Sequence, residues 1–167
     1  YLSVENIKVK MKKRQIEIYS AVELVSVKKT KLHTRILFDL YKSRDEGTKI
    51  STNSDLNYEE HKKFVENNPY RFWLILKLNE NYIGTSYVKY DNGIGVYLLQ
   101  EHKCALKSVV KKIKDTFQPL PAKPSERRWG FHMNISQNNT EFEEALKDIG
   151  AELMQKTYYL RPENSDG

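Results

Sequence analysis

The sequence predicts a single α/β domain, and three observations lead to that class. The chain has 167 residues, which suffice for one substantial hydrophobic core and are too few for two ordinary domains. Stretches with the β-branched and alternating residues typical of strands lie between stretches with apolar residues at helical spacing. Hydrophobic residues make up 39% of the chain and charged residues 30%, which is the balance of a globular protein rather than a disordered one.

One folded unit with short ends is expected. Residues 1–14 are basic and weakly patterned, so they are predicted to be poorly ordered. Residues 15–162 form the predicted domain, and residues 163–167 form a C-terminal tail. The sequence contains no internal repeats and no low-complexity segments.

The first elements are predicted from a change in the spacing of apolar residues along the chain. Residues 16–27 are dense in β-branched side chains and predict one strand or two short ones. Residues 29–43 carry apolar side chains at helical spacing and predict a helix. The polar residues 44–56 predict a loop. Asn57 and Glu60 then have the spacing of a capping box and predict the start of a second helix.

A meander of three strands is predicted next, over residues 71–78, 82–90 and 94–99. Asn79-Glu80-Asn81 joins the first two strands, and Asp91-Asn92-Gly93 has the composition of a tight hairpin turn.

The last third of the chain begins with the most regular helical pattern. Apolar side chains fall on one face of residues 106–117, and lysines occupy the other positions. Three prolines exclude a helix over residues 118–128, which are therefore an extended connector. Thr140 and Glu143 resemble a second capping box. The remaining predicted elements are a strand over 129–135, a helix over 140–149 and a last strand over 153–160.

Composition also limits the kinds of site. Cys104 is the only cysteine, so an intrachain disulfide and a cysteine metal cage are excluded, and the four histidines lack metal-ligand spacing. We therefore expect no metal. No apolar run approaches the roughly 18 residues of a membrane span, and no signal peptide is evident, so a cytoplasmic location is expected. The net charge of +6 favours anionic partners such as nucleotides, CoA or nucleic acid.

This order of elements resembles the GNAT superfamily of acyl-CoA-dependent N-acyltransferases over about residues 22–160. Residues 72–75 and 82–85 look like the second and third strands of that family, and residues 94–98 look like the fourth. Asn139 lies 11 residues before Gly150, as in the C-terminal pattern of the family. The resemblance implies a mixed, mostly antiparallel sheet with helices on both faces. It also implies direct transfer of an acetyl group from acetyl-CoA to a small amine.

The resemblance further implies where the co-substrate binds. In the family, the fourth and fifth strands splay apart, and the free edge of the fourth strand pairs with the pantetheine arm. The N-terminus of the next helix points at the pyrophosphate, where unpaired N–H groups and the helix dipole favour an anion. The implied cofactor-binding residues are Val96, Leu98, Leu99, Lys103, Cys104, Ala105, Leu106, Lys107, Ser108 and Asn139.

The sequence departs from the family pattern in two places. Residues 100–108 contain no glycine, whereas the family has a Gly-x-Gly pattern that lets the backbone approach phosphate closely. Leu146 occupies the position where many members have the tyrosine that protonates the departing thiolate. Tyr97, Tyr158 or water is then the candidate proton donor.

Candidate substrate contacts lie on the other side of the presumed cleft. His61, on the short second helix, is a candidate catalytic and substrate-binding residue, and Arg44 and Trp73 are candidate substrate contacts. Residues 58–61 and Phe64 are similar to a pattern in acetyltransferases that modify nucleotide-linked amino sugars. That likeness makes such a sugar one expected acceptor.

Two other functions stay open at this point. A GNAT-like domain without catalysis, acting as a binding or regulatory module, would account for the glycine-free loop and for Leu146. A nucleic-acid-binding protein would account for the positive charge, and its binding would depend strongly on salt. Nucleic acid is the less expected partner. A monomer or a homodimer is expected.

Overall fold

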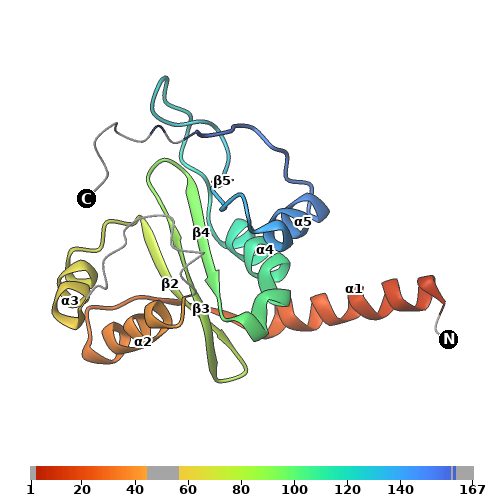
Figure 1. Ribbon diagram of the computed structural model, residues 1–167, viewed down its shortest axis with the longest axis horizontal. Helices are drawn as coiled ribbons and strands as arrows, with labels where there is room; N and C mark the ends of the chain where they lie inside the picture. The colour runs from red at the N-terminus through yellow and green to blue at the C-terminus, as the bar shows by residue number, and fades with distance from the viewer. Residues whose placement is uncertain (1–2, 45–56, 159, 161–167) are drawn as a thin grey trace.

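The computed structural model describes residues 3–44, 57–158 and 160, and Figure 1 shows a central sheet with helices beside it. Within that part of the chain the sheet has five strands in sequential order, and only the last pair is parallel. The predicted mixed, mostly antiparallel α/β class is confirmed. The strands are β1 (Val22–Ser26), β2 (Phe72–Leu78), β3 (Asn81–Val88), β4 (Gly93–Leu98) and β5 (His132–Met133).

Helices cover both faces of this sheet. α2 and α3 lie on one face, and α1, α4 and α5 lie on the other. No helix in the described ranges is long and apolar enough to cross a membrane. Residues 45–56 of the predicted loop and the predicted tail, residues 163–167, lie outside the described residues. The helices are α1 (Val4–Ala21), α2 (Lys31–Lys42), α3 (Tyr58–Asn67), the 3₁₀ helix η2 (Gln100–Ala105), α4 (Leu106–Thr116) and α5 (Thr140–Asp148).

The meander of β2, β3 and β4 is confirmed, and its turns are built from the predicted residues. Asn79 and Glu80 both have positive φ, 47° and 66°, which is the backbone of a type I′ hairpin. Asn92 in the second turn is fully buried, with φ 69°. Its side chain accepts from Leu120 N at 2.7 Å and donates to the carbonyls of Leu120 and Arg128 at 2.8 and 3.1 Å. The proline-rich connector is thereby fixed to the hairpin.

Both faces of the central strands are buried, so β2 reads as a continuous apolar run rather than an alternating one. One face packs an aliphatic core against α1, α4 and α5. Its buried members include Ile18, Val22, Leu74, Leu76, Ile83, Leu106, Val109 and Ile113. The other face packs an aromatic core against α2 and α3. Its members include Ile36, Leu37, Leu40, Val65, Tyr70, Trp73, Ile75, Tyr87 and Tyr97.

Helix α1 corrects the prediction for the N-terminal region. A strand was predicted over residues 16–27, yet the chain is helical up to Ala21, and the segment expected to be poorly ordered is helical from Val4. Ser3 begins the helix by accepting a hydrogen bond from Asn6 N at 3.3 Å. Figure 1 shows the N-terminal half of α1 projecting away from the sheet.

Contacts with α4 explain why β-branched residues become helical here. The Tyr19 hydroxyl donates to Asp115 at 2.8 Å. The Lys112 ammonium group donates to the carbonyls of Tyr19 and Val22 and so binds the C-terminal end of α1. These tertiary contacts override the local strand propensity.

The C-terminal third also differs from prediction. The strand expected over residues 129–135 is reduced to His132–Met133. The last strand predicted over 153–160 is absent in its described residues, 153–158 and 160, which are exposed and irregular, so no apolar face is buried there. Asn139, not Thr140, caps α5, because its side chain accepts from Phe142 N at 3.3 Å. The capping box of Asn57 and Glu60 on α3 is confirmed.

Candidate functional site

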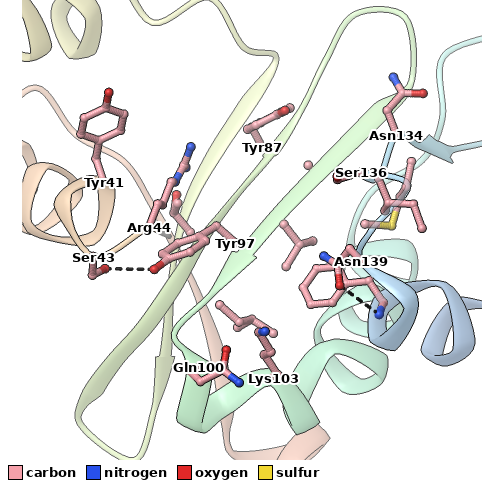
Figure 2. Close-up of a pocket in the computed structure, with 17 residues that line it drawn as sticks. Tyr41, Ser43, Arg44, Tyr87, Tyr97, Gln100, Lys103, Asn134, Ser136 and Asn139 are labelled. Atoms are coloured by element: carbon pink, nitrogen blue, oxygen red, sulfur yellow. Dashed lines mark hydrogen bonds between the residues drawn. The ribbon is translucent and has the colours of Figure 1, made fainter. Parts of the chain in front are cut away.

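β4 and β5 part after two paired residues, and a cleft opens where they separate. Only Gly93 and Ile94 pair with β5. The cleft has a volume of about 240 Å³. Figure 2 shows Arg44 and Tyr97 on one side of β4 and Asn139 on the other. The lining residues are Tyr41, Ser43, Arg44, Thr85, Tyr87, Gly95, Val96, Tyr97, Leu98, Gln100, Lys103, Met133, Asn134, Ile135, Ser136, Asn139 and Phe142.

The edge of β4 that faces the cleft carries free backbone groups. The Leu99 N–H donates to the Ile83 carbonyl at 2.9 Å, so the odd-numbered residues of β4 direct their backbone groups toward β3. The Asn92 carbonyl accepts from the first residue of β5 at 3.2 Å, so even-numbered residues face the other way. The backbone groups of Val96 and Leu98 therefore point to the side on which β5 has ended. An extended ligand can pair there like an added strand.

Tyr97 and Arg44 form the cleft wall on the aromatic side. The Tyr97 hydroxyl lies 3.0 Å from Ser43 Oγ. The Arg44 guanidinium carbon lies 4.9 Å from the Tyr97 ring centroid and 5.8 Å from that of Tyr41. Arg44 Nε is buried and has no hydrogen-bond partner. The rings thus position a cation that keeps an unused donor.

A glycine allows an aromatic ring to lie flat on β4. A Cβ at Gly95 would stand 2.1 Å from Tyr87 Cζ, so only glycine leaves room for that ring. Tyr87 in turn stacks on Tyr70 with centroids 4.3 Å apart and planes 7° apart. Burial, reinforced by the neighbouring Tyr87, raises the pKa of Tyr70 to about 12. Tyr70 is therefore a neutral structural support at neutral pH.

His61 lies one layer behind the cleft rather than in it. Its side chain is buried against the rings of Phe38 and Tyr41, with centroids 5.5 and 6.2 Å away. Burial lowers the pKa of His61, a backbone hydrogen bond with Thr34 partly offsets this, and the charge of Arg44 lowers it further. His61 Nε2 has no partner. The imidazole is thus neutral at pH 7 and separated from the cleft by Tyr41.

The other predicted residues on this side also lie outside the cleft. Trp73 is buried, and its indole N–H donates to Thr85 Oγ1 at 3.2 Å. Tyr158 is 81% exposed, beyond α5, and does not line the cleft. Of the three predicted catalytic residues, the structure therefore brings only Tyr97 into the cleft.

Four of the residues predicted to bind the cofactor line the cleft together, and they are Val96, Leu98, Lys103 and Asn139. Lys103 Nζ lies 3.7 Å from a carboxylate oxygen of Glu141. The Asn139 side-chain oxygen is used as the cap of α5. Leu99 packs on the opposite face, with the aromatic core.

The remaining five predicted residues surround the start of α4 and do not line the cleft. Ala105 and Leu106 are buried in the aliphatic core. The Ser108 hydroxyl faces Gln15 on α1, 3.0 Å from its carbonyl oxygen and 2.8 Å from Oε1. The other two positions also have intramolecular contacts: Lys107 pairs with Asp148, and the carbonyl of Cys104 accepts from Gln15 Nε2.

The structure therefore fits CoA at one end more closely than at the other. The open edge of β4 suits the pantetheine arm, and Lys103 supplies a cation beyond it. At the end where the resemblance places the pyrophosphate, the chain forms η2, and the Leu106 N–H already donates to the Lys103 carbonyl. The first turn of α4 thus offers fewer unpaired donors than an open helix end.

The cleft is positively charged. Arg44 and Lys103 line it, and among the described lining residues there is no Asp, Glu, His or Cys. The described ranges also contain no group of three or more His, Cys, Asp or Glu side chains that could hold a metal ion. Sequence patterns missed Tyr41, Ser43 and Gln100 because each is an ordinary polar residue at the end of an element.

No protein-family model and no curated protein matches the chain. Among solved structures, the chain is similar to a possible acetyltransferase from Clostridium difficile 630, with a TM-score of 0.53 and 12% identity. The match covers 85% of this chain and 97% of that chain. The fold is GNAT-like. The likeness concerns the fold alone.

Proposed function

We propose that this chain is an acyl-CoA-dependent N-acetyltransferase that transfers an acetyl group directly to a small amine. One observation carries the proposal. In a GNAT-like fold, the free backbone groups of Val96 and Leu98 face a cleft that reaches both sides of β4. Such a cleft lets an extended co-substrate enter from the side of Asn139 and an amine from the side of Arg44.

The chain's own residues divide the task of binding. Val96 and Leu98 would hold the pantetheine arm through backbone hydrogen bonds, and Lys103 would attract its phosphates. Acetyl-CoA supplies an activated acyl group when it is bound. Thr85, Tyr87 and Tyr97 would form the floor on which the acceptor rests, so that both reactants are held at short distance in one cleft.

The proton balance rests on few groups. Transfer forms a C–N bond and breaks a C–S bond, and the amine loses one proton while the departing sulfur needs one. Since no carboxylate or imidazole is among the described lining residues, the amine proton would leave through water in the open cleft. The Tyr97 hydroxyl, held at 3.0 Å by Ser43, is the candidate donor to sulfur.

Calorimetric titration with acetyl-CoA and CoA tests the proposal. Saturable binding to the wild-type chain is expected, weakened about ten-fold or more in Lys103→Ala through loss of a charge-assisted contact. Lys123→Ala is the matched control, because Lys123 lies on the connector and pairs with Glu126 at 2.7 Å. Absence of saturable binding in the wild type would overturn the proposal.

The acceptor is tested next, by release of free thiol from acetyl-CoA in the presence of amines. Nucleotide-linked amino sugars are the first acceptors to try, alongside simple amines. Tyr97→Phe should lower kcat more than it raises KM, because the lost hydroxyl acts on the leaving group. Equal activity of Tyr97→Phe and wild type would remove Tyr97 from the mechanism.

A second candidate function is a GNAT-like binding or regulatory module without catalysis. The observation that favours it is the start of α4, where η2 occupies the place of the glycine-rich loop and Ser108 and Lys107 already have intramolecular partners. This alternative predicts either no CoA binding or CoA binding without thiol release. Saturable binding with amine-dependent thiol release would exclude it.

A further inference from the structure

The cleft contains a cation with an unused hydrogen-bond donor, and the inference drawn from it rests on the proposed transferase function. Arg44 is half-buried and lines the cleft, while its Nε is buried without a partner. Its guanidinium lies over the rings of Tyr97 and Tyr41. A ring face attracts the positive charge but accepts no in-plane N–H, so the donors of Arg44 are left for another acceptor.

Among the described residues, none supplies a counter-ion for this charge. In the described ranges, no carboxylate lies within ion-pair distance of Arg44, and the lining contains neither Asp nor Glu. The other cation of the cleft, Lys103, differs in having Glu141 at 3.7 Å. A half-buried charge without a partner is costly unless a ligand completes it.

Arg44 also lies where an acceptor would enter. Figure 2 places Arg44 and Tyr97 on one side of β4, opposite Asn139 and Lys103, which lie toward the proposed CoA side. A group bound to Arg44 would therefore lie across the open edge of β4 from the co-substrate. That is the position of the acceptor rather than of CoA.

We infer that Arg44 binds an oxyanion of the acceptor, so that the substrate is a small amine that also carries a carboxylate or a phosphate ester. Both oxyanions accept two parallel N–H bonds from one guanidinium, a geometry that lysine does not reproduce. The Tyr97 and Tyr41 rings restrict the guanidinium and so orient the acceptor amine.

Matched acceptor pairs test the inference and separate the two oxyanions. The carboxylate pair is 4-aminobutyrate and 4-aminobutanamide, and the phosphate pair is glucosamine 6-phosphate and glucosamine. In Arg44→Gln, kcat/KM should fall about 10- to 100-fold for the oxyanion-bearing member of the preferred pair, as expected for loss of a hydrogen bond between charged groups. The members without an oxyanion should fall far less. The pair that shows the difference identifies the oxyanion.

Arg35→Gln is the matched control, because Arg35 lies on α2, the helix that ends shortly before Arg44, is exposed and pairs with Asp39 at 3.1 Å. It should leave all four acceptors unchanged. Arg44→Lys should recover only part of the loss, since the charge remains and the two-donor geometry does not. An equal fall for the members with and without an oxyanion, or no fall at all, would overturn the inference.

A second measurement needs neither acetyl-CoA nor turnover. The ¹⁵N resonance of Arg44 Nε, assigned by its absence in Arg44→Lys, is followed while glutarate or glycerol 3-phosphate is added. A saturable shift is expected, and it should be missing for the other arginine resonances. If the protein binds CoA but the Arg44 resonance does not shift, the inference about Arg44 is overturned and the transferase proposal is unaffected. A saturable shift in a protein that does not bind CoA overturns the transferase proposal and leaves an oxyanion site.

Discussion

The two faces of the sheet differ in what they contain, and the difference separates stability from function. The fully or nearly buried members of the aliphatic core, under α1, α4 and α5, are Leu, Ile and Val apart from Ala105 and Phe142. The aromatic core, under α2 and α3, contains stacked rings and the buried polar atoms of His61 and Arg44 that lack partners. Unpartnered polar atoms lower stability, so the buried Nε of Arg44 at the cleft indicates a face shaped for binding.

The largest expected effect is on the aliphatic side. Ile113 on α4 is fully buried, and Ile113→Ala should lower the free energy of unfolding by about 3 kcal/mol through loss of apolar burial and a residual cavity. Denaturant unfolding measures the change. The native emission of Trp73, on the opposite face, should stay the same when it is measured in a Trp129→Phe background that removes the other tryptophan. A shifted native emission would show that the two cores are not independent.

A smaller loss is expected on the aromatic side from Gly95→Ala. The added Cβ meets the Tyr87 ring at 2.1 Å, so overpacking should lower the free energy of unfolding by about 1–3 kcal/mol. In a Tyr87→Ala background, Gly95→Ala should lower the free energy of unfolding far less. Denaturant unfolding of the four members of this double-mutant cycle gives the coupling, and additive losses would contradict the proposed contact.

Acid should destabilise the aromatic side through His61. Its pKa is lowered in the folded state, so the unfolded chain binds the proton more readily. The stability is present above pH 6.5 and falls as the pH drops below that value, by no more than about 1.4 kcal/mol per pH unit for one proton. Unfolding free energies from pH 7.5 to 5.5 should show a shallower fall in His61→Phe.

His33 is the control for that slope. Burial also lowers its pKa, with a further contribution from the charge of Lys28, so it acts in the same direction from outside the aromatic core. His33→Gln should remove only its own share of the pH dependence. If His61→Phe leaves the slope unchanged and His33→Gln abolishes it, the buried imidazole is not the titrating group.

The smallest effect concerns the cleft wall. Ser43→Ala removes the bond of Ser43 Oγ with the Tyr97 hydroxyl and its bond to the Leu40 carbonyl at 2.8 Å, and should lower the free energy of unfolding by about 0.5–1 kcal/mol. Tyr97→Phe removes only the first of these bonds. The double variant should therefore be no less stable than Ser43→Ala, by denaturant unfolding. A further loss in the double variant would mean that the Tyr97 hydroxyl has another partner.

Local sequence patterns predicted those parts of the fold whose structure depends on residues that are neighbours in sequence. The connection at Asn79 and Glu80 and the capping box of Asn57 and Glu60 are each encoded within about four residues, and both lie where they were predicted, although the type I′ backbone of the turn was not predicted. Helix α1 could not be predicted in this way. Its β-branched residues favour a strand, and contacts of Tyr19 and Lys112 across about ninety positions of sequence make it a helix.

The candidate site was predictable only in part, for the same reason. The open edge at Val96 and Leu98 was expected from the resemblance to the GNAT superfamily. The burial of His61 behind Tyr41, and the engagement of Ser108 by Gln15, depend on how distant helices pack. Arg44 was named from its loop position, but its unpartnered Nε is visible only in three dimensions.

The turn at Asn92 has a consequence for the chemical lifetime of the protein. An Asn-Gly pair deamidates when the glycine nitrogen attacks the carbonyl carbon of the asparagine side chain. This reaction releases ammonia and leaves a rearranged backbone. In this chain the Gly93 N–H donates to Asp91 Oδ1 at 2.8 Å, and both side-chain atoms of Asn92 are held by the connector. The bonds that hold the hairpin to the connector thus also slow its deamidation.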